Sequence, residues 1–282
     1  MKLLVTGAAG MLGRDLMLAA GNAGHDVVGF GRAELDVTDA AAVGRKFELE
    51  RPDVVINSAA WTDVDGAESA EEAAFAVNGA GAGNVAAAAA ELGAAVVYVS
   101  TDYVFDGAKR APYVESDQPA PLSAYARTKL AGEEATIAAN KRHFVVRAGG
   151  LFGIGGNNFV ETMLRLGAVQ SEVTVVRDQV ASPTYTWHLA YGIVRLIEGV
   201  EFGIHHMAAA GECSFYDFAR EIFEQAKLDC KVLSVTSEEF GRPAPRPPYS
   251  ALTSQREHPI RLPSWRDGLA GYLAQREVEE AA

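Results

Sequence analysis

Cysteine is nearly missing from this chain, which carries Cys213 and Cys230 and no others. Two cysteines cannot form the disulfide framework of a small secreted domain, and their spacing matches no zinc-binding pattern. A fold held together by buried apolar surface, with free thiols in a reducing compartment, is therefore expected.

Long hydrophobic runs are missing as well. The first apolar run ends at Thr6-Gly7, which is too short for the core of a signal peptide. No segment approaches the roughly 20 apolar residues that are needed to cross a bilayer. The sequence thus predicts a cytoplasmic protein with no membrane partner.

Positive charge is in short supply, because 25 Lys and Arg stand against 37 Asp and Glu, a formal net charge of −12. Such a surface repels a phosphate backbone, so nucleic acid is not an expected partner. An anionic ligand would need a local pocket built from helix N-termini and basic side chains.

Short β-branched runs alternate with Ala-rich stretches through the first half of the chain. The runs do not alternate with polar residues, which is typical of parallel strands buried on both faces. Right-handed crossovers between them predict an α/β fold of the Rossmann type, a doubly wound parallel sheet. The expected strands are Leu3–Thr6, Val27–Phe30, Val54–Asn57, Val96–Ser100 and Phe144–Arg147, and the expected helices are Met11–Ala20, Ala40–Glu50, Ala67–Leu92 and Ala124–Asn140.

The pattern loosens after about residue 150, which predicts a dinucleotide-binding domain over residues 1–150 and a smaller, mainly substrate-binding lobe over 151–282. A strand and a helix of the later sequence are expected to return to the first domain. In the lobe, proline prevents helix or central strand over Arg242–Pro248, and the polar tail from Gln275 is expected to fray. Its expected elements are helices at Phe159–Leu166, Trp187–Ile197 and Phe215–Ala226 and a strand near Val173–Val176.

A glycine-rich turn, Gly7-Ala8-Ala9-Gly10-Met11-Leu12-Gly13, joins the first strand to the first helix. Gly7 permits the tight turn, Gly10 lets the backbone approach a pyrophosphate, and Gly13 lets helix and sheet pack closely. The helix N-terminus adds amide donors and a positive dipole. Together these features predict a dinucleotide cofactor.

The tip of the second expected strand carries Arg32 where an NAD site usually has an acid. A guanidinium there can pair with a ribose 2′-phosphate, so NADPH is the predicted cofactor. In the alternative interpretation Arg32 is a solvated loop charge and Glu34 contacts the ribose, which would allow NADH.

Three residues suggest a proton relay. Tyr125 and Lys129 are four residues apart on one expected helix, which places the ammonium about one turn from the phenol. A nearby cation stabilises a phenolate, so we expect Lys129 to lower the pKa of Tyr125. Thr101, at the carboxyl end of the fourth strand, can hold a substrate carbonyl beside the phenol while hydride arrives from nicotinamide.

These segments resemble the extended short-chain dehydrogenase/reductase family and, within it, the dTDP-4-dehydrorhamnose reductases, over nearly the whole chain. The resemblance implies NADPH-dependent reduction of the 4-keto group of a nucleotide-linked sugar, dTDP-4-dehydro-L-rhamnose giving dTDP-L-rhamnose. It rests on TGAAGMLG at Thr6–Gly13, LDVTD at Leu35–Asp39, NSAAWTDVDGAE at Asn57–Glu68, VNGAGAGNVA at Val77–Ala86, VSTDYVFDG at Val99–Gly107, YARTKLAGE at Tyr125–Glu133, NFVETML at Asn158–Leu164 and DQVASPTYTWHLA at Asp178–Ala190.

The resemblance also implies roles for single residues. Thr101, Tyr125 and Lys129 would be the catalytic residues. The three glycines, Arg32, Tyr125 and Lys129 would share the cofactor with Met11, Leu12, Asp36, Val37, Ala59, Ala60 and Trp61. The sugar nucleotide would contact Thr62, Val64, Thr101, Asp102, Tyr103, Tyr125 and Gly150, and Arg246, Tyr249 and the DQVASPT segment would belong to the substrate lobe.

One position departs from the family pattern, because Gly150 stands where a tryptophan that touches the sugar is expected. Loss of that ring would enlarge the pocket and leave the sugar undecided. Phe152 is expected to compensate in part. The alternative interpretation of Asp102 and Tyr103 is a capped junction between strand and loop.

Two other functions stay open at this point. A nucleotide-sugar epimerase or dehydratase would use the same Tyr and Lys with tightly held NAD, and a regulatory subunit similar to that of methionine adenosyltransferase would use no chemistry at all. Neither His205 and His206 nor any other cluster predicts a metal site, and no residue allows a magnesium ion to be placed. A monomer and a homodimer both fit the sequence.

Overall fold

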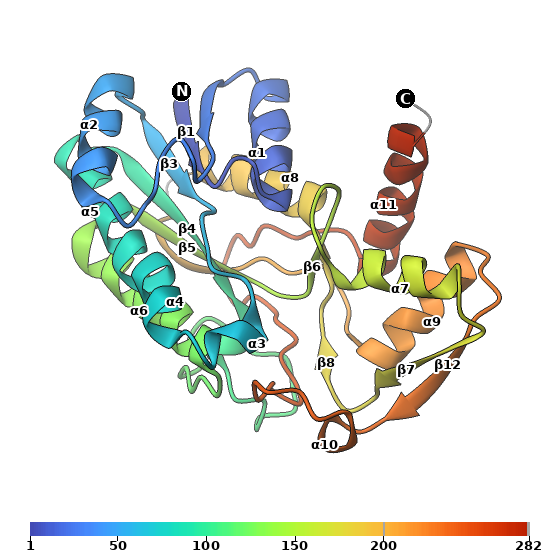
Figure 1. The fold of residues 1–282 in the computed structure, drawn as a ribbon. Coiled ribbons are helices and arrows are strands. Elements are labelled where there is room, and N and C mark those ends of the chain that lie inside the picture. The colour runs from blue at the N-terminus through green and yellow to red at the C-terminus, as the bar shows by residue number, and fades with distance from the viewer. Residues whose placement is uncertain (200, 281–282) are drawn as a thin grey trace.

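A parallel sheet of six strands forms the centre of the molecule (Figure 1). The computed structural model describes residues 1–199 and 201–280. Strand order is β10-β5-β4-β3-β1-β2, so the chain winds outward in two directions from β1 and β3. The strands are β1 (Lys2–Thr6), β2 (Asp26–Phe30), β3 (Val54–Asn57), β4 (Ala95–Thr101), β5 (His143–Ala148) and β10 (Gly203–His206). The predicted doubly wound fold is confirmed.

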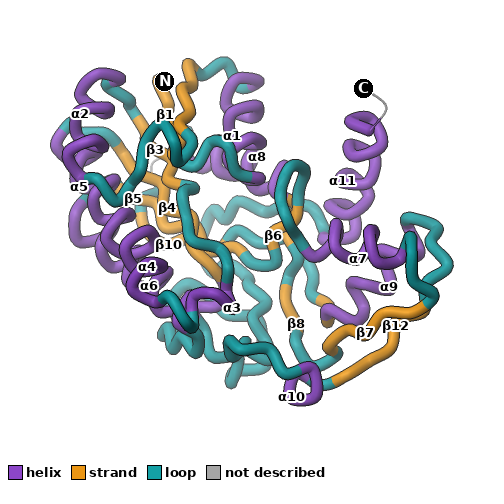
Figure 2. The backbone as a smooth tube through the Cα atoms, viewed as in Figure 1, coloured by secondary structure: helices purple, strands orange, loops and turns teal. Residues whose placement is uncertain are grey.

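Helices cover both faces of this sheet (Figure 2). On β1, Leu3 and Val5 join an apolar cluster with α1 (Met11–Asn22) and α8 (Thr186–Ile197), while Leu4 joins one on the opposite face. That second face is covered by α2 (Ala40–Glu50), α5 (Ala82–Glu91) and α6 (Ala124–Ala139). Successive strand side chains point to opposite faces, so burial on both sides explains why the strands show no polar alternation.

A smaller lobe lies beside the sheet (Figure 1). Aromatic side chains form much of its buried core. Phe152, Phe218, Trp265 and Tyr272 are buried in one cluster. Its elements are α7 (Phe159–Gly167), α9 (Phe215–Gln225), α10 (Ser237–Phe240), α11 (Trp265–Glu280), a parallel pair of β7 (Glu172–Val176) and β12 (Lys231–Val235), and the short strands β6 (Leu151–Phe152), β8 (Val180–Ala181), β9 (Thr184–Tyr185) and β11 (Cys213–Ser214).

Two later elements lie with the first 150 residues. Strand β10 pairs in parallel with β5, and α8 packs against α1. The function assigned to each of the two domains stays a prediction. In the described part of the chain, no helix combines the length and the apolar character of a membrane span.

The single helix predicted over Ala67–Leu92 is wrong. This stretch contains the end of α3 (Val64–Ala67), a turn, α4 (Glu71–Phe75), a π-helical segment η1 (Ala76–Gly81) and α5. The side chain of Asn78, which is fully buried, accepts from the Trp61 amide (2.9 Å) and donates to the Trp61 carbonyl (3.1 Å). These bonds pull the π-helical turn toward the loop after β3, and such turns are frequent at functional sites.

The polar tail was predicted to fray from Gln275, but α11 continues through Glu280, and residues 281–282 lie outside the described residues. Gln275 accepts a hydrogen bond from the Tyr185 hydroxyl, and the Arg276 guanidinium lies 2.8 Å from a Glu161 oxygen. This polar segment buries little apolar surface of its own. The tertiary contacts therefore stabilise its helical conformation. The proline-rich segment 242–248 contains neither helix nor strand, as predicted.

Helix α6 approaches β4 closely at Gly132. A Cβ on this residue would overlap the Asn78 carbonyl oxygen and the Tyr98 hydroxyl. The same Tyr98 hydroxyl donates to the Asn78 carbonyl oxygen at 3.0 Å and lies 3.3 Å from the Lys129 carbonyl oxygen. The small residue therefore sets the distance between the helix and the strand that carry Tyr125 and Thr101.

A substitution at this contact should destabilise the protein. Gly132→Ala should lower the free energy of unfolding by about 1–3 kcal/mol, because the backbone must shift to admit the methyl group. Gly44→Ala in α2 is the matched control: its Cβ meets nothing within 4 Å, so it should raise stability by roughly 0.5–1 kcal/mol. Urea unfolding followed by circular dichroism measures both, and equal stabilities would contradict the packing argument.

Candidate active site

The candidate site is a cavity of about 1130 Å³ at the carboxyl ends of the central strands. Loops after β1, β2, β3, β4 and β5 line it on one side, and Gln179, Phe215, Phe240, Arg242 and Arg246 of the later sequence line it on the other. Ligands of open α/β sheets bind at this edge. Every residue given above as a catalytic residue or as a contact of the cofactor or the sugar nucleotide lies on this cavity's wall. Of the residues assigned to the substrate lobe, Gln179 and Arg246 lie on the wall and Tyr249 does not.

The glycine turn has the geometry that a pyrophosphate requires. Gly7 has φ +68°, and a Cβ there would come within 2.7 Å of the Ala59 nitrogen. A Cβ on Gly13 would overlap the Gly7 carbonyl oxygen. Gly10 caps α1 with no side-chain hydrogen bond, so the first amides of this helix are free to face an anion. The residues present thus fit a dinucleotide phosphate.

The residues after β2 bear on the two interpretations of the ribose site, in which either Arg32 pairs with a 2′-phosphate or Glu34 contacts the ribose. Arg32 lies on the cavity wall and forms no hydrogen bond or ion pair with the described residues. The Glu34 carboxylate turns back to accept from the Gly31 amide at 2.8 Å and is not on the wall. The charge of Arg32 acts on Asp36 but is not held in an ion pair with the described residues, and a cation at this point favours a phosphate over a bare hydroxyl. Asp36 faces Thr38, whose amide and hydroxyl hold the pKa of that carboxyl below its usual range.

Sequence reasoning did not identify Asn78, although its motif had been recognised. Besides the two bonds to Trp61, its amide donates to the Thr128 hydroxyl at 3.0 Å. Asn78 therefore ties the loop that carries Ala59, Ala60 and Trp61 to α6, which carries Tyr125 and Lys129. An asparagine followed by a glycine inside an otherwise helical pattern was the available signal.

Thr101, Tyr125 and Lys129 come together in the cavity. The Thr101 hydroxyl lies near enough to the Tyr125 phenol to oppose the rise that burial causes in its pKa, and Lys129 Nζ donates to the Val99 carbonyl oxygen at 2.7 Å. Lys129 is 2% exposed and its Nζ lies 4.2 Å from the centre of the Tyr98 ring. Tyr103 packs edge-to-face on Tyr125, with ring centres 6.3 Å apart.

Burial governs the proton affinities of this group. It lowers the pKa of Lys129 to about 7, and the Glu133 carboxylate opposes that shift. It raises the pKa of Tyr125 well above its usual range, against the hydrogen bond with Thr101. We predicted that Lys129 lowers the Tyr125 pKa, but among the chain's own residues burial prevails, because the ammonium is turned to Val99.

Asp102 and Tyr103 occupy different surroundings. Asp102 is 2% exposed and accepts from the Thr101 and Ser250 hydroxyls, and burial raises its pKa to about 6. The Thr101 hydroxyl also accepts from the Tyr103 amide at 3.1 Å, which is the capped junction that the alternative interpretation described. Burial raises the pKa of Tyr103 to about 12, and its hydroxyl meets Arg246. The predicted sugar contacts remain compatible with this geometry.

Gly150 has φ +55° and lies against Pro183, so a side chain at this position would be strained. The residue lines the cavity, whereas Phe152 does not. Phe152 is fully buried in the core of the smaller lobe, stacked at 5.7 Å on Tyr185. The expectation that Phe152 compensates for the missing aromatic ring is therefore wrong.

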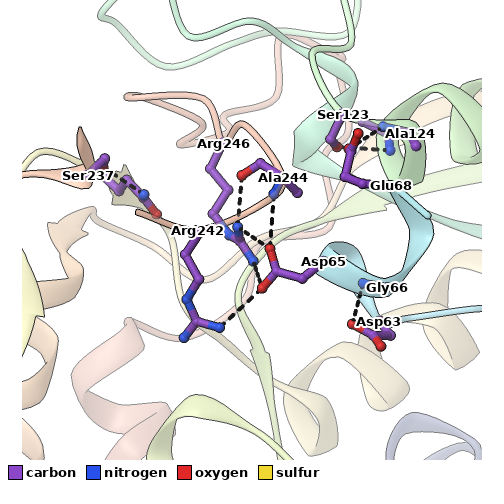
Figure 3. A network of polar contacts seen from close by, with 12 residues as sticks. Asp63, Asp65, Gly66, Glu68, Ser123, Ala124, Ser237, Arg242, Ala244 and Arg246 are labelled. Atoms are coloured by element: carbon purple, nitrogen blue, oxygen red, sulfur yellow. Dashed lines mark hydrogen bonds and ion pairs between the residues drawn. The ribbon is translucent and has the colours of Figure 1, made fainter. Parts of the chain in front are cut away.

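Asp65 of α3 connects the two sides of the cavity (Figure 3). Arg246 holds its carboxylate with two bonds, at 2.9 and 3.0 Å, and Arg242 adds one at 3.1 Å. The Ala244 amide donates to the same carboxylate at 3.1 Å. Chiefly through Arg246, these donors lower the pKa of Asp65 to about 2. Tyr249 lies away from the cavity, where it packs near Phe105 and donates to Glu212.

Comparison with known proteins identifies the family. Residues 1–278 match the model of the RmlD substrate binding domain. The chain belongs to this family.

Two relatives and one solved structure cover most of the chain. A dTDP-4-dehydrorhamnose reductase of Mycobacterium tuberculosis is 44% identical over 285 residues, 97% of this chain and 92% of the relative. A dTDP-4-keto-6-deoxy-D-glucose reductase of Streptomyces niveus is 42% identical over 251 residues, 88% and 87% of the two chains. The crystal structure of a dTDP-4-dehydrorhamnose reductase from Bacillus anthracis in complex with NADP has a TM-score of 0.95 at 39% identity and covers 97% of this chain and 99% of its own.

The contact at Asp65 should stabilise the fold in a pH-dependent way. Asp65→Asn should lower the free energy of unfolding by at most about 1 kcal/mol at pH 7, because the ion pairs are partly exposed. The pKa of Asp65 is about 2 in the folded protein and 3.8 in its usual state. The contribution of the ionised carboxylate to the free energy of unfolding is therefore complete above pH 3.8 and is lost as the pH falls to about 2. The difference in unfolding free energy between wild type and variant should therefore narrow between pH 4 and pH 2.5.

Arg242→Ala provides the control, since its side chain is 55% exposed and makes one bond to Asp65. It should cost less than Asp65→Asn in the same unfolding measurement. A difference between wild type and Asp65→Asn that stays constant down to pH 2.5 would contradict the role assigned to the charge.

Proposed function

We propose that this protein reduces the 4-keto group of a nucleotide-linked sugar with NADPH, converting dTDP-4-dehydro-L-rhamnose to dTDP-L-rhamnose in the cytoplasm. The observation that carries the proposal is the meeting of Tyr125, Thr101 and Lys129 on the wall of the cavity that also contains the Gly7–Gly13 turn. Similarity to named reductases of dTDP-linked keto sugars over most of the chain supports it.

The cofactor side of the cavity follows from its donors. The amides at the start of α1 would hold the pyrophosphate, and Arg32 would pair with the 2′-phosphate. Asp36, Val37 and the loop Ala59–Trp61 would enclose the rest of the nucleotide. Bound NADPH supplies a hydride.

Tyr125 supplies the proton in the proposed reaction. Its hydroxyl protonates the sugar oxygen as hydride reaches the carbonyl carbon, so the ketone becomes an alcohol. The Thr101 hydroxyl, whose proton otherwise goes to Asp102, would turn to donate a hydrogen bond to the same oxygen and hold it beside the phenol. The Lys129 ammonium stabilises the phenolate that remains, which is costly in a buried site without a positive charge.

The sugar nucleotide would lie toward Thr62, Val64, Tyr103 and Gly150. Arg246 and Arg242 place positive charge on the cavity wall, where it can bind the phosphates of the sugar nucleotide. Such a local positive charge is needed because the chain as a whole is strongly acidic. Gly150 has no side chain that would define the shape of the sugar. Reductases that act on different dTDP-linked keto sugars are therefore the proteins with which this one should be compared. The chain would act as a monomer or a homodimer.

A coupled assay tests the function. The protein should oxidise NADPH when dTDP-4-dehydro-L-rhamnose is supplied, and more slowly or not at all with UDP- and GDP-linked keto sugars. An epimerase or dehydratase would instead retain NAD through gel filtration and consume no NADPH. A regulatory subunit would show no turnover with any keto sugar, and either result would overturn the proposal.

Removing the phenol should abolish the reaction without unfolding the protein. Tyr125→Phe keeps the ring that packs on Tyr103 and should lower kcat by about 10²–10⁴-fold, the usual contribution of a positioned proton donor. Its urea unfolding midpoint should stay near that of the wild type. Turnover at the wild-type rate would exclude Tyr125 as the proton donor.

Arg32 should decide between the two nicotinamide cofactors. Arg32→Ala should raise KM for NADPH by roughly tenfold and leave KM for NADH unchanged, because only the 2′-phosphate loses its partner. Glu34→Gln is the matched control, since this carboxylate faces the Gly31 amide. A change of preference in Glu34→Gln but not in Arg32→Ala would support the alternative interpretation, in which Glu34 contacts the ribose.

A further inference from the structure

A buried acid lies one helical turn beyond Lys129. Tyr125, Lys129 and Glu133 are spaced by four residues along α6 and therefore share one face of the helix. Glu133 is 1% exposed and is not on the cavity wall. The reaction proposed above assigns no task to this carboxylate, and burying a charge is costly unless partners hold it.

Two partners fix the Glu133 carboxylate. Arg147 of β5 binds it with two nitrogens, Nη2 to Oε2 at 2.7 Å and Nε to Oε1 at 3.0 Å. The Ser100 hydroxyl of β4 donates to Oε1. Both partners are at most 5% exposed. A bidentate pair of this kind leaves the carboxylate little freedom to move.

The side chains of Lys129 and Glu133 form hydrogen bonds with neighbouring residues of the same strand. Lys129 Nζ donates to the Val99 carbonyl oxygen, and Glu133 accepts from Ser100, which is the next residue. Thr101 follows directly. The strand therefore holds the ammonium, the buried acid and the substrate-facing hydroxyl in a fixed order, and the contact at Gly132 keeps the helix in place.

The charges around Lys129 are few. From the elements packed against it, the titratable or charged groups are Tyr125 and Glu133 on α6, Tyr98 on β4, Arg147 on β5, Asp102 and Tyr103 after β4, and His206 on β10. His206 is neutral, because its Nδ1 faces the Tyr113 carbonyl oxygen, its Nε2 faces Arg147, and burial lowers its pKa. Burial keeps the phenols in their neutral form as well.

We propose that Glu133 is a positioning residue that keeps the Lys129 ammonium charged in the buried site, and that Arg147 holds the Glu133 carboxylate at the place from which it does so. Glu133 acts through Lys129 and touches no reacting atom. Arg147 carries the same charge as Lys129 and therefore limits the effect of Glu133. Burial lowers the proton affinity of Lys129, and one buried anion and one buried cation then adjust it in opposite directions.

The titration of Lys129 itself tests this proposal. Lysine side chains labelled with ¹³C at the ε-carbon report the midpoint by NMR, and Lys129→Arg identifies the signal. In the full chain without added cofactor, the wild-type midpoint should lie near 7. Glu133→Gln should lower it by about one pH unit or more, because Arg147 then acts alone.

Variants of Arg147 should shift the midpoint in a definite order. Arg147→Met should raise it above the wild type, and Glu133→Gln/Arg147→Met should fall between Glu133→Gln and the wild type. The double variant replaces the ion pair by uncharged side chains, a change that buried sites often tolerate even when one unpaired partner does not. It keeps the test decisive if Arg147→Met fails to fold.

Glu134→Gln is the matched control, because it removes the same charge from the adjacent, exposed residue of α6. It should leave the midpoint of Lys129 in place. If Glu133→Gln and the double variant titrate like the wild type, Glu133 has only a structural role and the inference is overturned.

The consequence for turnover rests on the proposed function, whereas the NMR midpoint does not. In the NADPH assay, the high-pH limb of kcat should move to lower pH in Glu133→Gln by the same amount as the Lys129 midpoint. A merely structural role would lower kcat evenly at all pH values. A shifted midpoint in a protein without reductase activity would refute the function and leave the positioning role standing.

Discussion

The close contact between α6 and β4 is the constraint on which the site depends. Gly132 lets α6 approach until the Tyr98 hydroxyl lies 3.3 Å from the Lys129 carbonyl oxygen, and a Cβ on Gly132 would overlap that hydroxyl. At this separation, Lys129 reaches Val99 and Tyr125 reaches Thr101. A wider spacing would keep the fold but would part the phenol from the hydroxyl beside which a carbonyl could be held.

Because water is excluded from this contact, the charged groups there interact strongly with one another. Lys129, Glu133 and Arg147 are each at most 2% exposed, so they interact through protein rather than solvent. In such surroundings an unpaired charge is very costly, and each of these groups has a partner or an acceptor. A lysine of low proton affinity on the cavity wall therefore lies next to an ion pair that salt screens much less than a surface pair.

Partly exposed ion pairs hold the segment on the other side of the cavity, and they are weaker than the buried pair of Glu133 and Arg147. Asp65 accepts hydrogen bonds from Arg242, Ala244 and Arg246 (Figure 3). A net acidic chain thus keeps two of its arginines beside the cavity by pairing them with a single carboxylate. Thr101, Tyr125 and Lys129 lie on β4 and α6, whereas Arg242 and Arg246 lie on a segment without helix or strand.

The sequence by itself determined the sheet, the glycine turn and the i, i+4 pairing of Tyr125 and Lys129, because each depends on local spacing and periodicity. Tertiary structure decided the rest. Asn78 distorts its helix to reach Trp61, Phe152 enters the lobe core, and Asp65 pairs with Arg246, 181 residues away. Burial also reversed the expected shift of the Tyr125 pKa. Solvent exclusion and contacts between distant residues arise only when the whole chain packs, so no local pattern encodes them.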